Sequence, residues 1–132
     1  MMKPENKIMI IENDPQLLNS LAFTLKRREY QVTVGSNKEE VLKCVEDARD
    51  GGNPFSLLII DIQLPGLAEL ELIETLRKKS IPIPVLVLTA YGNKDFFLRL
   101  KERHIEDFLT KPFNSDELVK RVSSMLKRQS GI

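Results

Sequence analysis

The feature that most constrains this chain is a run of four aliphatic residues that ends in a carboxylate, Leu57-Leu58-Ile59-Ile60-Asp61. A short continuous apolar run is typical of a strand that is buried on both faces, as the central strands of parallel sheets are. Pro65-Gly66 follows shortly afterwards and ends the strand in a loop. The pattern therefore predicts that Asp61 lies at the carboxyl end of a central strand, where open α/β sheets place their ligand sites.

Other segments with the character of strands and helices alternate along the chain. The expected strands are Ile8–Ile11, Tyr30–Val34, Leu57–Asp61, Val85–Leu88 and Asp107–Thr110. Apolar residues recur at helical spacing in five further segments, which are Pro15–Leu25, Lys38–Arg49, Leu67–Lys79, a segment around Phe96–Leu100, and one that begins at Asn114 or Ser115. Strands that alternate with helices indicate an α/β domain with a parallel sheet.

Length and composition narrow the class of protein. We expect residues 1–132 to form one domain, with its core at about residues 8–127. Twenty basic and nineteen acidic residues give a net charge of +1, which favours neither nucleic acid nor a membrane as a partner. Met1–Lys7 is polar and predicts no signal peptide. The single cysteine, Cys44, excludes an internal disulfide and fits a cytoplasmic protein, and its helical spacing from Val41 predicts a core position.

Polar side chains stand where the expected strands end. They are Glu12, Asn13, Asp61, Thr89 and Lys111. The carboxyl ends of parallel strands meet at one edge of the sheet, so we expect these side chains to lie close together. Acids and an amide suit a hard cation such as Mg²⁺, whereas a hydroxyl and an ammonium suit the oxygens of a transferring phosphoryl group. Asp61 is the candidate nucleophile, because carboxylates form aspartyl phosphates.

Four separate segments together resemble the receiver domain of two-component response regulators (CheY-like), over nearly all of residues 8–126. The segments are Glu12-Asn13-Asp14-Pro15, Asp61-Ile62-Gln63-Leu64-Pro65-Gly66, Leu88-Thr89-Ala90 and Phe108-Leu109-Thr110-Lys111-Pro112-Phe113. The resemblance implies a flavodoxin-like, doubly wound parallel sheet of five strands in the order 2-1-3-4-5, with five helices. It also implies that a sensor histidine kinase or phosphotransfer protein phosphorylates Asp61 in the presence of Mg²⁺, and that the domain then controls a downstream effector domain or protein.

The resemblance also implies a set of metal ligands. Glu12 and Asn13 correspond to the two acids that bind the metal in the family, the first of them through water. Asp61 and the backbone carbonyl of Ile62 or Gln63, for which we take Gln63, complete the protein's share of the ligands.

For the phosphorylated state, the resemblance implies roles for three further residues. Thr89 would bind a phosphoryl oxygen, and Lys111, which precedes a proline held cis in the family, would pair with the phosphate. Phe108 corresponds to an aromatic residue that turns inward when the threonine moves. The surface that changes would comprise the fourth helix, the fifth strand and the fifth helix. This surface is also the one through which a homodimer could form. Such a domain assists its own phosphorylation and dephosphorylation, but it is not an enzyme with turnover.

Three residues depart from the family pattern. Asn13 replaces an aspartate and removes a negative charge, so we expect weaker Mg²⁺ binding. Asp14 either compensates for that loss or caps the helix that begins at Pro15. Glu69 stands in place of a glycine in the turn before the third helix, where it would alter the course of the loop. His104 also replaces a glycine, and we interpret it as a structural histidine.

The departures leave a second function open, in which a receiver-like module binds partners without being phosphorylated. Asn13 and Glu69 favour that alternative, whereas the retained Asp61, Thr89 and Lys111 oppose it. A small α/β enzyme or flavin-binding protein is a third alternative, and the lack of a glycine-rich loop after the first strand counts against nucleotide binding. We interpret the basic residues of the last helix as a solvated face and not as a nucleic-acid site.

Overall fold

The computed structural model of the chain describes residues 6–63, 67–90, 94–105 and 107–129. In chain order, its elements are β1 (Lys7–Ile11), α1 (Pro15–Lys26), β2 (Gln31–Gly35), α2 (Lys38–Asp50), β3 (Leu57–Asp61), α3 (Leu67–Lys78), β4 (Val85–Thr89), α4 (Lys94–Glu102), β5 (Asp107–Thr110) and α5 (Ser115–Gln129). The strands form one parallel sheet in the order β2-β1-β3-β4-β5. The predicted fold class and strand order are confirmed.

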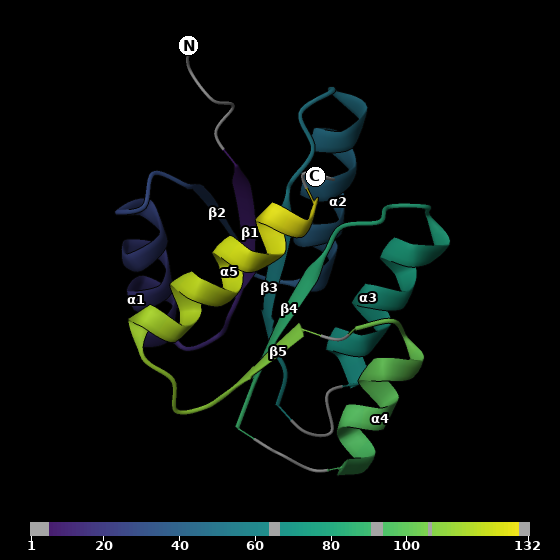
Figure 1. Cartoon of the computed structure of the whole chain (residues 1–132). Helices are drawn as coiled ribbons and strands as arrows, with labels where there is room; N and C mark the ends of the chain where they lie inside the picture. The colour runs from purple at the N-terminus through teal and green to yellow at the C-terminus, as the bar shows by residue number, and fades with distance from the viewer. Residues whose placement is uncertain (1–5, 64–66, 91–93, 106, 130–132) are drawn as a thin grey trace.

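Helices cover both faces of this sheet. Figure 1 shows α1 and α5 on one side of the strands and α3 and α4 on the other. Successive strand residues point to opposite faces, so Ile8 and Ile10 pack with α1 and α5, whereas Met9 packs with α2, α3 and α4. Every residue of β3 is buried, as the continuous apolar run predicted. Asp61 is therefore the polar end of a strand that is enclosed on both faces.

The predicted strand bounds agree with the structure to within one residue, and β2 shows why one of them shifted. We expected the strand to stop at Val34, because glycine commonly marks a turn. Gly35 instead pairs with Ile11 of β1 and ends the strand. A side chain at position 35 would overlap Cγ2 of Val41, a fully buried residue of α2. Glycine is needed here because α2 packs directly against the end of β2.

Side-chain oxygens of three residues cap helices at their N-termini. Asp14 Oδ1 accepts a hydrogen bond from the backbone N–H of Gln16 at 3.0 Å and is exposed, so its role is that of the α1 cap. Asn37 caps α2 in the same way. The N-cap of the last helix is Asn114 and not Ser115, because Asn114 Oδ1 accepts a hydrogen bond from the backbone N–H of Glu117 at 2.8 Å.

The ends of the first four helices share one backbone arrangement. Each is followed by a residue of positive φ, and the next N–H bonds back to a carbonyl of the last helical turn; the four residues are Glu29, Gly52, Ser80 and His104. His104 has a φ of 60° and is exposed, which agrees with a structural histidine and explains why a glycine suits that position.

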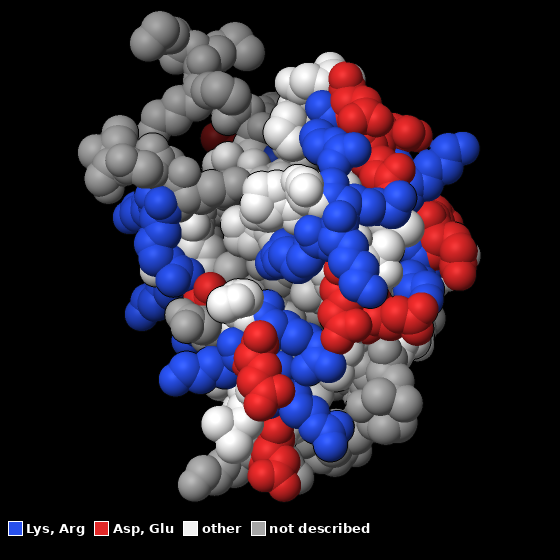
Figure 2. All heavy atoms as spheres, turned by 90° about the vertical axis from the view of Figure 1, so that its right-hand side faces the viewer, with Lys and Arg blue, Asp and Glu red and all other residues white. Residues whose placement is uncertain are grey.

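Ion pairs join the three helices on one face. Lys38–Glu71 and Lys79–Glu46 link α2 with α3 and the turn after it, and Arg103–Glu74 links α3 with the residue that follows α4. Figure 2 shows basic and acidic side chains intermixed over this side of the molecule, with no large area of one sign.

Two further expectations concern α5 and the core. Arg128 and Arg121 of α5 both pair with Asp107, at 2.7 and 3.9 Å, which agrees with a solvated helix face. Cys44 is half-buried and packs against the core cluster beneath α2. Among the described residues, no helix is long and apolar enough to cross a membrane.

Candidate functional site

Asp61 and Lys111 form the centre of the site. Asp61 ends β3, and Lys111 directly follows β5, in a cis peptide bond to Pro112 as the resemblance implied. Lys111 Nζ donates to Asp61 Oδ2 at 2.5 Å, and the Asp61 side chain is only 4% exposed. A buried, charge-assisted hydrogen bond of this kind fixes the carboxyl group in one orientation.

Glu12 is a second buried acid beside this pair. Its pKa is raised to about 7, first because burial disfavours the charged form, and then because Asp61 lies next to it as a hydrogen-bond partner and a like charge. The backbone N–H of Asp14, which donates to Glu12 Oε1 at 2.9 Å, and the charge of Lys111 act in the opposite direction. The repulsion between two neighbouring buried acids is reduced either by a proton that they share or by a bound cation.

The two acids meet at a small cavity that fits a cation. With both acids ionised, two buried side-chain oxygens lack a hydrogen-bond partner among the described residues, Glu12 Oε2 and Asp61 Oδ1; with a proton on Glu12, the two acids share that proton. Both residues line a cavity of about 50 Å³, which is room for a few waters or for an ion that replaces some of them. Asn13 and Gln63 line it as well, so the predicted ligand set converges there. The donor set, two carboxylates with amide and carbonyl oxygens, suits Mg²⁺.

Thr89 and Phe108 lie on the two strands beyond Asp61. Thr89 ends β4, is fully buried, and its carbonyl accepts from the N–H of Lys111 at 2.8 Å. Phe108, in β5, is half-buried and stacks on Phe97 of α4, with ring centroids 4.4 Å apart and planes at 15°. The structure thus connects the lysine of the site, through β5, with a ring on α4. The expected loop at residues 64–66 lies outside the described residues.

Glu69 is the residue whose position differs most from expectation. We expected it in a turn before the third helix, but it lies inside α3, in its first turn, with ordinary helical backbone. The expectation that Glu69 lies in the turn is therefore wrong, whereas the course of the loop at residues 64–66 lies outside the described residues. Glu69 is half-buried and lines the same cavity as Asn13 and Asp61. The signal that could have found it is the pairing of two departures, an acid lost at one position and gained at another.

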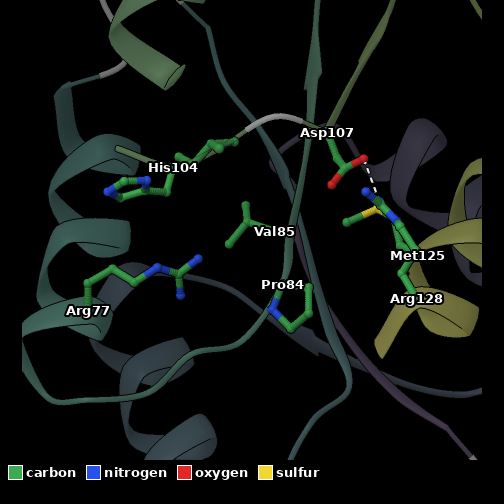
Figure 3. Close-up of a pocket in the computed structure, with 8 residues that line it drawn as sticks. Arg77, Pro84, Val85, His104, Asp107, Met125 and Arg128 are labelled. Carbon is green, nitrogen blue, oxygen red and sulfur yellow. Dashed lines mark hydrogen bonds and ion pairs between the residues drawn. The ribbon is translucent and has the colours of Figure 1, made fainter. Parts of the chain in front are cut away.

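A larger cavity, of about 310 Å³, lies at the opposite edge of the sheet, where β4 and β5 begin (Figure 3). Its charged side chains already have partners within the protein. Arg77 Nη1 donates to the carbonyls of Ile81 and Ile83 at 3.1 and 2.9 Å, and Arg128 Nη2 donates to Asp107 at 2.7 Å. These contacts hold the loop before β4 and the start of β5, away from the residues that gather around Asp61.

Comparisons with known proteins agree with this geometry. A family model described as "Response regulator receiver domain" matches residues 8–123. The chain is 33% identical over 125 residues to "Transcriptional activator protein PfeR" of Pseudomonas aeruginosa. The matched region covers 95% of this chain and 39% of PfeR. The chain is also 31% identical over 125 residues to "Two-component response regulator PhoP" of the same species, covering 95% of this chain and 53% of PhoP. The chain thus spans about half or less of the length of these curated relatives.

Among solved structures, a response regulator receiver domain protein (CheY-like) from Methanospirillum hungatei JF-1 has a TM-score of 0.83 to this chain. The match is 23% identical in sequence and covers 97% of this chain and 98% of that one. At this identity the likeness shows the fold, which is that of the parallel sheet described above.

Proposed function

The chain belongs to the response regulator receiver domain family of two-component signal transduction, and on that premise we propose that Asp61 is the residue that accepts the phosphoryl group. The observation that carries this proposal is the environment of its carboxylate. Lys111 holds Asp61 Oδ2, whereas Asp61 Oδ1 has no hydrogen-bond partner among the described residues and borders the cavity with Glu12. Lys111 thus orients the carboxyl group through one oxygen, and no basic or amide group of the described residues donates to the other.

The chemistry that this arrangement supports is transfer from a phosphohistidine. A carboxylate oxygen of Asp61 attacks phosphorus, the bond from phosphorus to the imidazole nitrogen breaks, and the imidazole leaves with that electron pair. Lys111 neutralises charge on the phosphoryl oxygens, and the hydroxyl group of Thr89, whose strand ends beside Asp61, donates a hydrogen bond to one of them. The phosphorylated aspartate later returns to the carboxylate by hydrolysis. The domain therefore assists its own modification without being an enzyme that turns over a free substrate.

Mg²⁺ is the cofactor that we propose for the cavity. Glu12, Asp61, the Asn13 side chain and the Gln63 backbone carbonyl would hold it, with water in the remaining positions. When bound, the cation neutralises charge on the transferring phosphoryl group. The two unpartnered buried oxygens support its presence, and Asn13 is expected to weaken its affinity.

A sensor histidine kinase or a phosphotransfer protein is the proposed phosphodonor, and an effector domain or protein is the proposed recipient of the signal. The names of the curated relatives, a transcriptional activator and a two-component regulator, support an output of this kind. We propose the α4-β5-α5 face as the output surface, and it is also the surface for a homodimer if one forms. A cytoplasmic location, without direct contact with nucleic acid or membrane, accompanies the proposal.

The test is chemical phosphorylation followed by intact-mass measurement. The protein is incubated with acetyl phosphate and excess Mg²⁺, and we expect a gain of one phosphoryl group. Asp61→Asn should show no gain, and neither should the wild type in EDTA. Asp50→Asn, which changes an exposed aspartate at the end of α2, serves as the matched control and should be phosphorylated normally.

The outcome would also decide between the two functions. No gain in wild-type protein at high Mg²⁺ would reject the phosphoacceptor and favour a module that binds partners without phosphate. Phosphorylation recovered by Asn13→Asp would place the defect in the metal site.

A further inference from the structure

Two residues that line the cavity beside Asp61 depart from the family pattern, and their departures change the charge of the cavity in opposite directions. Asn13 brings an amide where an acid is expected, and Glu69 brings an acid from α3 to the same cavity. The two residues are far apart in sequence, and the fold brings both to the space bordered by Glu12 Oε2 and Asp61 Oδ1.

We propose that Glu69 supplies the negative charge that Asn13 lacks, by accepting a hydrogen bond from a water molecule bound to the divalent cation. This inference rests on the proposed function, because it concerns the cation of that same site. Glu69 would be a positioning residue, which acts on the cation through water and does not touch the reacting carboxylate.

The balance of charge supports a requirement for this residue. Glu12 and Asp61 are buried acids that line the cavity, and Lys111 already offsets the charge of Asp61 at 2.5 Å. A divalent cation would then leave the site with an excess of positive charge. An additional carboxylate at the rim restores neutrality, and hard cations favour sites with more carboxylates.

A contact through water fits the geometry better than direct coordination. In the part of the chain that the structure describes, no three acidic, histidine or cysteine side chains are grouped so that they could hold a metal together. Glu69 is half-buried at the rim, whereas Glu12 and Asp61 are buried deep in the cavity. Mg²⁺ gives up its waters reluctantly and keeps several when protein-bound, so a carboxylate that lines the cavity can accept a hydrogen bond from one of those waters.

Glu69 also differs from its neighbours on α3 in having no structural partner. Glu71 pairs with Lys38 at 2.9 Å, and Glu74 pairs with Arg103 at 2.6 Å. No ion pair or hydrogen bond of the Glu69 side chain is present among the described residues. The competing explanation is that an acid in the first turn only stabilises the helix N-terminus, and that role would leave cation affinity unchanged.

Titration with Mn²⁺ alone, and then with Mg²⁺ alone, tests the inference by calorimetry. We expect Glu69→Gln to weaken cation binding by about tenfold, the lower end of the effect of losing an outer-sphere partner. Glu71→Gln removes the same charge two residues away on the same helix and should leave the affinity unchanged. Asn13→Asp should tighten binding, and the double variant Asn13→Asp with Glu69→Gln should recover wild-type affinity.

Each outcome bears on one of the two claims. Equal affinities of wild type and Glu69→Gln, with both folded by circular dichroism, would overturn the role of Glu69. Phosphorylation of the wild type by acetyl phosphate, measured in parallel, would then still uphold the proposed function. A wild type that binds neither cation would overturn the inference, and a wild type that also gains no phosphoryl group would overturn the proposed function with it.

Discussion

At the scale of single residues, Glu12 and Asp61 determine how the site behaves without a cation. Both are buried, each has one oxygen without a partner, and a single lysine serves the pair. Burial and the neighbouring Asp61 raise the pKa of Glu12 to about 7. The folded protein therefore keeps a proton on Glu12 at pH values where the unfolded chain has released it.

This difference predicts a pH dependence of stability in EDTA. Between the ordinary pKa of 4.5 and the folded value of about 7, the folded state binds more protons than the unfolded state. The free energy of unfolding must then fall as the pH rises through this window, by up to about 3 kcal/mol. Urea denaturation at half-unit steps of pH measures it.

Glu12→Gln should remove this part of the slope, because its amide does not titrate. Glu117→Gln, which changes an exposed acid on α5, should keep it. An unchanged slope in Glu12→Gln would show that Glu12 titrates normally in the folded protein.

Single residues also show where sequence reasoning ends. Asp61 and Lys111 were predicted as neighbours, because the carboxyl ends of parallel strands meet at one edge, and they are in contact. The position of Glu69 at the cavity was not predicted, because it depends on how α3 is rotated and placed after the loop. Helical periodicity reports which face of a helix is apolar, but not what a first-turn residue faces across the end of the sheet.

At the scale of elements, the contact between α2 and the end of β2 depends on one missing side chain. We predict that Gly35→Ala lowers the free energy of unfolding by about 1–3 kcal/mol, as overpacking of a core does. The added methyl would overlap Cγ2 of Val41, whose branched side chain has few rotamers with which to move aside. Urea denaturation measures the loss.

Val41→Ala provides the test of mechanism for this prediction. It removes the atom that the new methyl would overlap, so the double variant should lose less stability than the sum of the two single variants. Additive losses would mean that the cost of Gly35→Ala arises from the backbone of β2 and not from α2.

The helix ends provide an element-scale prediction in the opposite direction. Ser80 and His104 hold φ values of 60°, a conformation that disfavours residues other than glycine. Both are exposed, so Ser80→Gly and His104→Gly should each raise the free energy of unfolding by about 1 kcal/mol.

Gly52→Ala is the matched control for these two variants. Gly52 has a φ of 81°, and a Cβ there would meet no atom within 4 Å, so its loss of stability would report backbone conformation alone. A loss of stability in His104→Gly would instead show that the imidazole makes stabilising contacts with the side chains that line the cavity at the start of β5.

At the scale of the whole molecule, the parallel sheet and the gathering of the polar residues at one of its edges follow from alternation, burial and turn residues, whereas the strand order was implied by the family resemblance. Those features are local, and the sheet follows from them because parallel strands need helical crossovers. The path from Asp61 to the output face is not local. It runs from Lys111 into β5, where Phe108 stacks on Phe97 of α4. The contact between Phe97 and Phe108 could not be predicted, because a helix pattern does not say which ring a phenylalanine contacts.

This path predicts how phosphorylation changes the protein as a whole. Phosphorylated Asp61 carries about two negative charges beside buried Glu12, and we expect Lys111, which pairs with the carboxyl group in this structure, to pair with the phosphate and to shift the end of β5 with it. If Phe108 then leaves its stack on Phe97, α4 loses a partner, and its backbone amides should exchange hydrogen faster while those of α2 remain unchanged. Hydrogen exchange with mass spectrometry, with and without acetyl phosphate and Mg²⁺, measures both helices in one experiment.

Asp61→Asn treated in the same way separates phosphorylation from the effects of the reagents, and its α4 should not change. Phe97→Ala removes the stack in advance, so its α4 should exchange fast without phosphate and respond little when phosphate is added. Because α2 packs on the same face of the sheet as α4 but does not carry this stack, equal changes in both helices would indicate a general loosening of the fold. Full phosphorylation without any change in α4 would contradict the coupling through Phe108.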